Sequence, residues 1–492
     1  MYSYHIFYFP FKWENFKLRD KTFSNQTYLK HLTFNQYSDW ERCPKITDEE
    51  ENNFLYNEQN YYYPFVHPVL YDDETADSLL MHYERKEPKN SKVTYHIRTN
   101  NKSYELEVDS MNLNLYATGV GMLTIYLLNS SEDQKEPEDI LAINQYGRRI
   151  FPPFIKDVEY RSLIAHELFI EGLNGYDGKY YENFSDYTNR NHEAYRKAWR
   201  PTSLITRLIS DLIEDVEISP IIDDRMFVNC WYGNDILSEK IKESPDDFMM
   251  KEYTEFWYQY VFIDSGGATC RNEAMKRSLL EKQTYRRWQK AGSLFGISRY
   301  ALLLVTNTEE FAKDVLAVHM RTIYSRMVEL AMIQRASILR FSSEVTEVSK
   351  LSKEGRGSKG LNARISNLYE EYIRFVNQVY FREVSAQEQG IEMYNLMMET
   401  MNIKEYIKDL DDEIGELYQY VSLVDDKARN RNAERLNTIA AIFLPATLFA
   451  GIFGMNSIID SGIKWIDFST HIGFVALGSL IASLYFLKLK NK

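Results

Sequence analysis

The sequence NTIAAIFLPATLFAGIFGMN, residues 437–456, decides the class of the fold. Its first 18 residues carry no charged side chain. As a helix they would extend about 27 Å, close to the ~30 Å hydrocarbon core of a bilayer. A second apolar stretch, residues 468–487, contains only His471 and Tyr485 as ionisable groups. Two such stretches predict either two membrane spans or a buried helical hairpin in a water-soluble protein.

The charges that flank the two stretches favour membrane spans. Basic residues precede the first stretch and follow the second, whereas the connection, residues 457–467, has Lys464 as its one basic residue. The flanking basic residues are Lys427, Arg429, Arg431, Arg435, Lys488, Lys490 and Lys492. Because positive charge is retained on the cytoplasmic side, we expect a multi-pass protein of the bacterial inner (plasma) membrane. Both termini are then cytoplasmic, and residues 488–492 form a cytosolic lysine tail.

Residues 307–436 predict long helices. Proline is absent from this region, and apolar residues recur at heptad-like spacing in three runs. The runs cover residues 316–330, 361–379 and 407–428. We therefore expect a long helical hairpin and stalk, in which a continuous helix over 361–436 would extend about 110 Å. The six-residue step from Met401 to Ile407 breaks the heptad register and predicts local unwinding of a supercoil.

Residues 1–306 predict a mixed α/β domain in the cytosol. Short alternating or apolar runs indicate strands, and longer amphipathic runs between them indicate helices. The expected strands cover residues 1–10, 93–98, 104–108, 121–128 and 299–305, and the expected helices cover 204–216 and 271–289. Residues 100–102 are expected to connect a hairpin, and Pro10 is expected to end the first strand.

Composition excludes several classes of function. The formal net charge of −13 argues against direct binding of a nucleic-acid backbone, which requires clustered Lys and Arg. Cys43, Cys230 and Cys270 form no CxxC pair, so neither a zinc site nor a disulfide framework is indicated. The chain has no P-loop and no nucleophile elbow, and His166-Glu167 does not continue into HExxH. We therefore do not expect an enzyme.

The first apolar stretch, residues 437–456, is unusual for a helix that faces lipid. It contains Pro445 and small or polar residues that favour close helix packing or a wet path. Residues spaced three or four positions apart lie on one face of a helix, and here that face consists of Leu436, Ala440, Leu444, Thr447, Gly451 and Gly454. Two spans cannot enclose a pore alone, so a pore would require several subunits around one axis. Simple helix packing is the alternative for each residue.

Residues 437–456 resemble the pore helix of CorA-type magnesium channels, which ends in the tripeptide found here as Gly454, Met455 and Asn456. The resemblance implies a homopentamer of α/β cytosolic domains, long stalk helices and a two-helix transmembrane pore module, an α+β membrane protein. Transmembrane helix 1, residues 437–456, would line the pore, and transmembrane helix 2 would follow at 468–487. The tripeptide would form the selectivity filter, with Asn456 holding a hydrated cation in its outer sphere. Mg²⁺ or another divalent cation would be the permeant ion.

The chain departs from this family in two respects. The outer loop, residues 457–467, lacks the Met-Pro-Glu-Leu of magnesium-transporting members, and Asp460 supplies one of few carboxylates at the mouth. Fewer carboxylates concentrate divalent cations less strongly. The soluble region is also larger than a typical member's, which suggests a gating ligand other than the permeant ion. Acidic residues 409–413 and 425–426 are either metal sensors or a solvated helix face.

Enlarged CorA relatives accompany type III CRISPR systems, where the gating ligand is a nucleotide messenger, an S-adenosylmethionine–AMP conjugate. The aromatic residues 8–13 and 60–64 resemble that group. Residues that could meet its phosphates are Arg148, Arg149, Arg271, Arg286 and Arg287, each of which could instead be an ordinary surface residue. We thus expect an antiviral effector channel opened by a nucleotide. The alternative is a housekeeping Mg²⁺ transporter gated by intracellular Mg²⁺.

Overall fold

The computed structural model describes most of the chain up to residue 457. The described residues are 1–15, 29, 32–43, 58–75, 78–86, 92–150, 165–173, 180–184, 203–243, 253–353, 358–457, 470, 473–474, 476–478 and 480–481. The chain forms two compact units, Met1–Ile414 and Gly415–Lys492. The first unit is a large α/β domain, as the sequence predicts.

Thirteen strands of the described residues form one sheet in the first unit. These strands are β1 (Ser3–Asn15), β3 (Trp40–Arg42), β4 (Leu80–Arg85), β5 (Thr94–Arg98), β6 (Ser103–Tyr116), β7 (Val120–Asn129), β8 (Glu167–Glu171), β9 (Tyr181–Asn183), β11 (Val216–Pro220), β12 (Phe227–Gly233), β13 (Thr284–Tyr285), β14 (Leu294–Ile297) and β15 (Ala301–Thr306). The order is β13-β14-β15-β12-β1-β7-β6-β5-β8-β9, with β11 beside β1 and β4 between β3 and β6. β12 and β15 are parallel, and the other pairs are antiparallel. A separate pair consists of β2 (Thr33–Phe34) and β10 (Ile213–Glu214).

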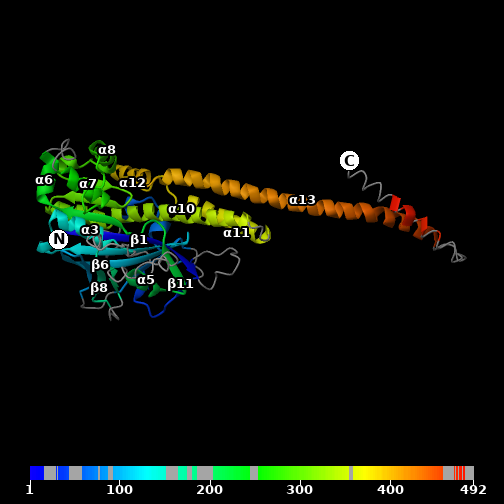
Figure 1. Ribbon diagram of the computed structural model, residues 1–492, viewed down its shortest axis with the longest axis horizontal. Coiled ribbons are helices and arrows are strands. Elements are labelled where there is room, and N and C mark those ends of the chain that lie inside the picture. The colour runs from blue at the N-terminus through cyan, green and yellow to red at the C-terminus, as the bar shows by residue number, and fades with distance from the viewer. Residues whose placement is uncertain are drawn as a thin grey trace. The chain divides into compact units, whose positions relative to one another are not determined.

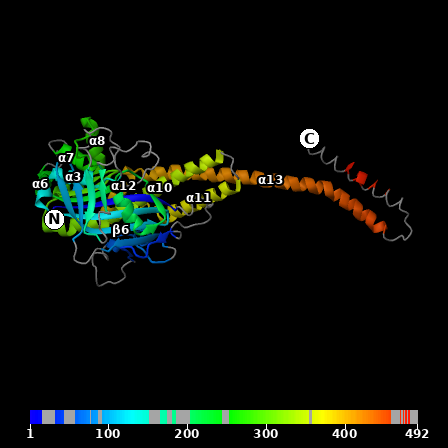
Figure 2. The same ribbon diagram turned by 60° about the horizontal axis from the view of Figure 1, so that its bottom comes forward.

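Helices cover both faces of this sheet. They are α2 (His67–Leu70), α3 (Pro137–Gly147), α5 (Ser203–Ser210), α6 (Asp235–Glu243), α7 (Thr254–Phe262), α8 (Glu273–Gln283), α9 (Ala317–Arg321), α10 (Ile323–Lys353), α11 (Ser358–Gln378), α12 (Glu388–Thr400) and α13 (Ile403–Ser457). One apolar cluster joins the sheet to α3 and α5 to α8, and a second joins it to α2, to α9 to α12 and to the first turns of α13. Figure 1 and Figure 2 show α10 and α11 running side by side.

Strand β1 separates the two apolar clusters because its side chains alternate between the faces of the sheet. Phe7, Phe9 and Phe11 pack in the cluster of α3, α5 and α7, whereas Ile6 and Tyr8 pack in the cluster of α10. All five side chains are buried. The strand is therefore covered on both faces, which explains its near-continuous apolar and aromatic sequence.

Pro10 does not end β1, so that expectation is wrong. On one side β1 pairs with β7 from Ser3 to Lys12. On the other side it pairs with β12 as far as Tyr8 and with β11 from Phe11 onward. Pro10 lies between these two partners, where its missing N–H interrupts no ladder on that side. The strand therefore continues to Asn15.

Some of the other elements predicted for the first unit are confirmed, and others are wrong. The hairpin of β5 and β6 and the buried strands β7 and β15 are confirmed. The helix predicted over 204–216 is wrong after Ser210, because the chain turns there into β10 and β11. The helix predicted over 271–289 ends at Gln283, where β13 joins the edge of the sheet through β14. Strand pairing overrides helix periodicity at both places.

A continuous helix over 361–436 is also contradicted. α11 ends at Gln378, and the segment that follows turns back into the core, where Phe381 and Val384 are buried. The Val384 carbonyl accepts a hydrogen bond from the Tyr63 N–H at 3.0 Å. α10 packs on β1 and β7, α11 packs along α10, and α12 packs beside β14, so the helix expected over 361–436 is divided into α11, α12 and α13. The irregular step after Met401 coincides with a complete break between α12 and α13.

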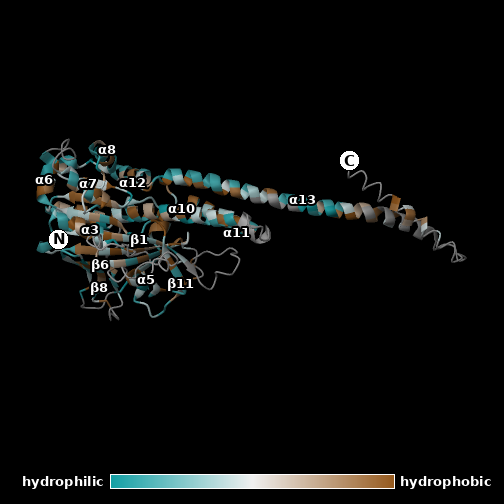
Figure 3. Cartoon of the chain, viewed as in Figure 1, coloured by the Kyte–Doolittle hydropathy of each residue, from teal (hydrophilic) through white to brown (hydrophobic). Residues whose placement is uncertain are grey.

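α13 continues from the first unit into the second. Figure 3 shows hydrophilic residues along much of this helix. Its first apolar positions, Ile403, Ile407, Leu410 and Ile414, are buried in the first unit. After Gly415 the described side chains are mostly exposed within a single chain. In the described part of the chain, no helix combines the length and the apolar character that a membrane crossing requires.

Candidate functional site

The helix that carries the predicted pore residues is α13. Leu436 and Leu444 are 67% and 63% exposed, and Ala440, Thr447 and Gly451 are also exposed. The Thr447 hydroxyl lies 3.1 Å from the carbonyl oxygen of Phe443 and 2.9 Å from that of Leu444. These residues are exposed in a single chain, as are the apolar residues Ile439, Phe443 and Leu448 elsewhere on the helix.

The predicted filter lies at the end of α13. Gly454, Met455 and Asn456 belong to the last turns of the helix, which ends at Ser457. Asp460 and the rest of the predicted outer loop lie outside the described residues. Of the second predicted span, 468–487, only scattered residues are described, and all of these are helical.

The first unit brings Arg148 and Arg149 into a cluster of arginines around Tyr300. Arg148 follows the end of α3. The backbone of Arg149 forms an isolated antiparallel β-bridge with that of Arg225, which lies just before β12. The guanidinium carbons of Arg148 and Arg225 lie 5.7 Å and 5.5 Å from the centre of the Tyr300 ring. Tyr300 projects from the turn between β14 and β15 and is 36% exposed. Cation–π attraction holds the ring beside these guanidinium groups.

Two aspartates partly neutralise this arginine cluster. Arg225 donates to both oxygens of Asp223, at 3.3 Å and 3.2 Å, and pairs with Asp224 at 3.2 Å. Arg149 pairs with Asp224 at 3.4 Å. Desolvation acts to raise the pKa of Asp223, but its hydrogen bond with Asp224 and the charge and hydrogen bonds of Arg225 outweigh desolvation and lower that pKa. Burial and the Asp223 carboxylate raise the pKa of Asp224.

Positive charge exceeds negative charge in the cluster. Arg148 is 1% exposed, and burial, aided by repulsion from Arg225, lowers its pKa to about 9. It therefore remains charged at neutral pH. Arg335 of α10 interacts electrostatically with Arg299, Asp223 and Tyr300, and burial lowers its pKa. Among the described residues the five arginines 148, 149, 225, 299 and 335 thus face two aspartates.

Two guanidinium nitrogens in the cluster are unsatisfied. The Nε atoms of Arg148 and Arg335 are buried, and neither has a hydrogen-bond partner in the described part of the chain. A buried donor without a partner is costly. Arg148 also donates from Nη2 to the Ile263 carbonyl, at a long 3.4 Å. Excess positive charge, unpaired donors and an exposed aromatic ring together make a site suited to an anion that carries a flat ring.

The other arginines expected from the sequence have different surroundings. Arg271 is exposed just before α8. Arg286 is also exposed. Arg287 is engaged by two carboxylates of α12, binding Glu388 at 2.6 Å and Glu392 at 2.8 Å. Sequence reasoning missed Arg225, Arg299, Tyr300 and Arg335. The first three lie directly beside strands, a placement that often marks binding residues and could have identified them.

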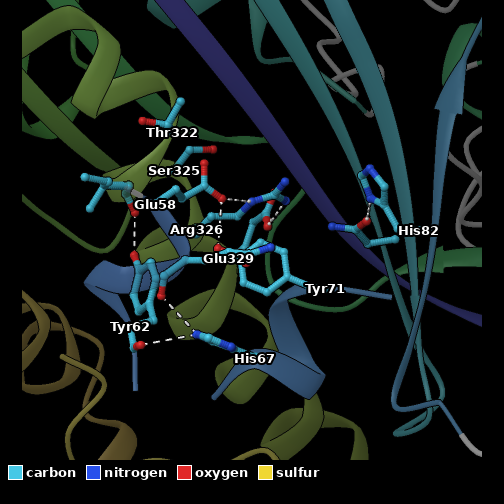
Figure 4. Close-up of polar contacts among 12 residues, drawn as sticks. Glu58, Tyr62, His67, Tyr71, His82, Thr322, Ser325, Arg326 and Glu329 are labelled. Atoms are coloured by element: carbon cyan, nitrogen blue, oxygen red, sulfur yellow. Dashed lines mark hydrogen bonds and ion pairs between the residues drawn. The ribbon is translucent and has the colours of Figure 1, made fainter. Parts of the chain in front are cut away.

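A second polar cluster is buried between α10 and the sheet (Figure 4). Arg326 donates from Nε to Glu58 at 3.1 Å and from Nη1 to Glu329 at 2.9 Å. The two carboxylates are 3% and 1% exposed, and the Tyr71 hydroxyl donates to Glu58 at 3.1 Å. We call Glu58, Arg326 and Glu329 the buried triad. It fastens the segment before α2 to α10.

Uncharged hydrogen bonds extend the buried triad toward the sheet. The Ser325 hydroxyl lies 2.8 Å from the hydroxyl of Tyr8, which donates to it, and 3.0 Å from that of Tyr126. His82 Nδ1 lies 2.6 Å from Asn114 Oδ1. Burial, aided by Arg326, lowers the pKa of His82 to about 4, so the ring is neutral at pH 7. A neutral ring leaves Arg326 as the cation that balances the two carboxylates.

The described residues contain no group of three or more His, Cys, Asp or Glu side chains that could hold a metal ion. The acidic residues Asp409, Asp411, Asp412 and Glu413 are exposed on α13. Their exposed positions fit a solvated acidic helix face within the first unit.

Comparison with known families identifies one part of the chain. Residues 298–490 match the family described as CorA-like Mg2+ transporter protein. The matched region contains β15, α9 to α13 and the predicted spans. Members of such a family are transporters or channels for divalent cations. No curated protein matches the chain.

The buried triad generates a stability prediction. Arg326→Met should destabilise the first unit by about 3–5 kcal/mol at neutral pH, because two buried carboxylates lose their counter-ion. The effect should grow as the pH rises. Burial already raises the pKa of Glu329, and Arg326 opposes that rise. Without Arg326, the buried Glu329 keeps its proton in the folded chain, whereas Glu329 of the unfolded chain releases its proton above about pH 4.3. The free energy of unfolding of the variant therefore falls as the pH rises above that value.

Denaturant unfolding of the full chain at about pH 5 and about pH 8 measures this difference. Arg321→Met is the matched control, because Arg321 is 49% exposed and pairs with Asp109 at 3.5 Å. It should cost less than about 1 kcal/mol at either pH. Equal losses for the two variants, or a loss for Arg326→Met that does not depend on pH, would refute the proposed role of the triad.

Proposed function

We propose that the protein is a CorA-like homopentameric cation channel of the inner membrane, gated by a ligand that binds its enlarged cytosolic region. The observation that carries this proposal is the match of residues 298–490 to the CorA-like Mg2+ transporter family. The exposed apolar face of α13 supports it, because that face needs neighbouring subunits or lipid.

In this proposal the residues 437–456 line the pore and residues 468–487 form the second span, with both termini in the cytoplasm. Five copies of Asn456 supply amide oxygens to a hydrated cation. Mg²⁺ releases its water reluctantly, so neutral oxygens that bind the hydrated ion suit entry without trapping it. Thr447 forms a second polar ring, and Leu436 and Leu444 form apolar constrictions that close by dewetting. Gly454 lets backbone carbonyls approach, and Asp460 lies at the outer mouth.

The gating ligand is an anion with an aromatic ring, of which a nucleotide is the natural example. The arginine cluster supports this choice, since Arg148, whose Nε has no partner among the described residues, lies beside the Tyr300 ring. Phosphate oxygens would bind Arg148 and Arg149 by charge-assisted hydrogen bonds, and a base could stack on Tyr300. Among nucleotides we propose an S-adenosylmethionine–AMP conjugate, which would make the channel an antiviral effector that dissipates ion gradients.

Ion flux through liposomes that contain the purified protein tests this function. We expect little flux with Mg²⁺ alone and a large increase when the S-adenosylmethionine–AMP conjugate is added, with ATP as a comparator. Flux that ignores every nucleotide and falls as internal Mg²⁺ rises would indicate a housekeeping transporter instead. Asn456→Ala should abolish selective conduction while the oligomer stays intact, and unchanged flux in that variant would refute the filter.

Arg148→Met tests the anion site separately from the pore. Losing a charge-assisted hydrogen bond to a phosphate costs about 1.5–3 kcal/mol, so the affinity for pyrophosphate should fall at least roughly tenfold. Titration calorimetry measures this change. Arg287→Met is the control, because Glu388 and Glu392 already occupy Arg287. An equal loss in both variants, or no loss in Arg148→Met, would contradict the site.

A further inference from the structure

The turn between β14 and β15 connects the arginine cluster to the start of α13. Tyr300 of this turn lies against Arg148 and Arg225. The preceding residue, Arg299, donates from Nε to the carbonyl oxygen of Thr400 at 3.0 Å. Thr400 is the last residue of α12. Two adjacent residues of one turn therefore contact the proposed ligand site and the end of α12.

The break between α12 and α13 consists of Met401 and Asn402. Asn402 has a φ of 55°, a left-handed conformation that non-glycine residues seldom adopt. With its amide oriented to satisfy both neighbours, Asn402 donates from Nδ2 to the Glu399 carbonyl at 3.0 Å and accepts from Arg299 Nη2 at 3.1 Å. Arg299 thus binds the end of α12 and the residue that directly precedes α13, on both sides of the break.

Arg335 connects the positive charge of the arginine cluster to Arg299 and to the start of α13. It donates from Nη1 to the carbonyl oxygen of Arg299 at 3.3 Å. It also interacts electrostatically with the Arg299 guanidinium and with Tyr406 in the first turn of α13. The buried Nε of Arg335 has no partner among the described residues. An anion that binds there would lie within the electrostatic reach of Arg299.

We propose that Arg299 is the positioning residue through which anion binding at the arginine cluster acts on α13, an inference that rests on the proposed function. In the absence of the anion, Arg299 holds the break with two hydrogen bonds to neutral oxygens. An anion attracts the guanidinium as a full opposite charge, which the neutral carbonyl and amide oxygens do not. The anion therefore draws Arg299 away from Thr400 and Asn402, and the break between α12 and α13 loosens. α13 is the helix that continues toward the proposed pore.

Amide hydrogen exchange of the full-length protein tests this coupling at residues 399–406. Without ligand, Arg299→Met should exchange several-fold faster there than the wild type, because both bonds are lost. Arg299→Lys can restore one bond and should give an intermediate rate. Arg321→Met, which removes an arginine of α9 bound to Asp109, should leave this segment unchanged. Equal rates in Arg299→Met and wild type would overturn the proposal.

Pyrophosphate added to the same samples supplies the second comparison. In the wild type it should protect residues 146–150 and speed exchange at 399–406. In Arg299→Met it should still protect residues 146–150 and change nothing at 399–406. A wild-type response at 399–406 in Arg299→Met would overturn the coupling and leave the anion site intact. No protection of residues 146–150 in the wild type would instead refute the anion site, and the coupling with it.

Discussion

The buried triad is the interaction on which the arrangement of the first unit depends. Arg326 lies on α10 with a carboxylate on either side, and one of these, Glu58, comes from a segment more than 260 residues away in sequence. Removing one member of such a buried ionic group leaves an uncompensated buried charge, which is strongly destabilising. Because Glu58 and Arg326 must meet, the register of α10 on the sheet and the place of α2 beside it are fixed together. The apolar side chains around the triad then supply most of the favourable free energy of burial.

A fixed α10 has a consequence for the proposed ligand site. Two helical turns beyond the triad, α10 places Arg335 beside the turn that carries Arg299 and Tyr300. The arginine cluster therefore collects residues from the end of α3, from the loop before β12, from one turn and from α10. None of these segments contains the site alone, and each is held by the sheet. An excess of positive charge persists there because the protein scaffold enforces it, which is typical of a site that awaits an anion.

Sequence reasoning predicted the parts that local patterns determine. Alternating residues identified β5 and β6, and short apolar runs identified β7 and β15. It failed where long-range pairing decides the structure: nothing near Pro10 indicates that the second partner of β1 changes there. Likewise, the heptad pattern over 361–436 did not reveal that Val384 returns to the core. Arg148 and Arg149 could be proposed from sequence, but Arg225 and Arg335 approach them only through the fold. The family match covers residues 298–490, which include the predicted spans.

In the proposed mechanism, an anion at the arginine cluster controls ion conduction. The dependence of liposome ion flux on nucleotide concentration tests it most directly, when wild type and Arg148→Met are compared. We expect the variant to need a concentration at least roughly tenfold higher for half-maximal flux, while the maximal flux stays the same. A half-maximal concentration equal to that of the wild type, in a variant that conducts normally, would show that the arginine cluster does not control the channel.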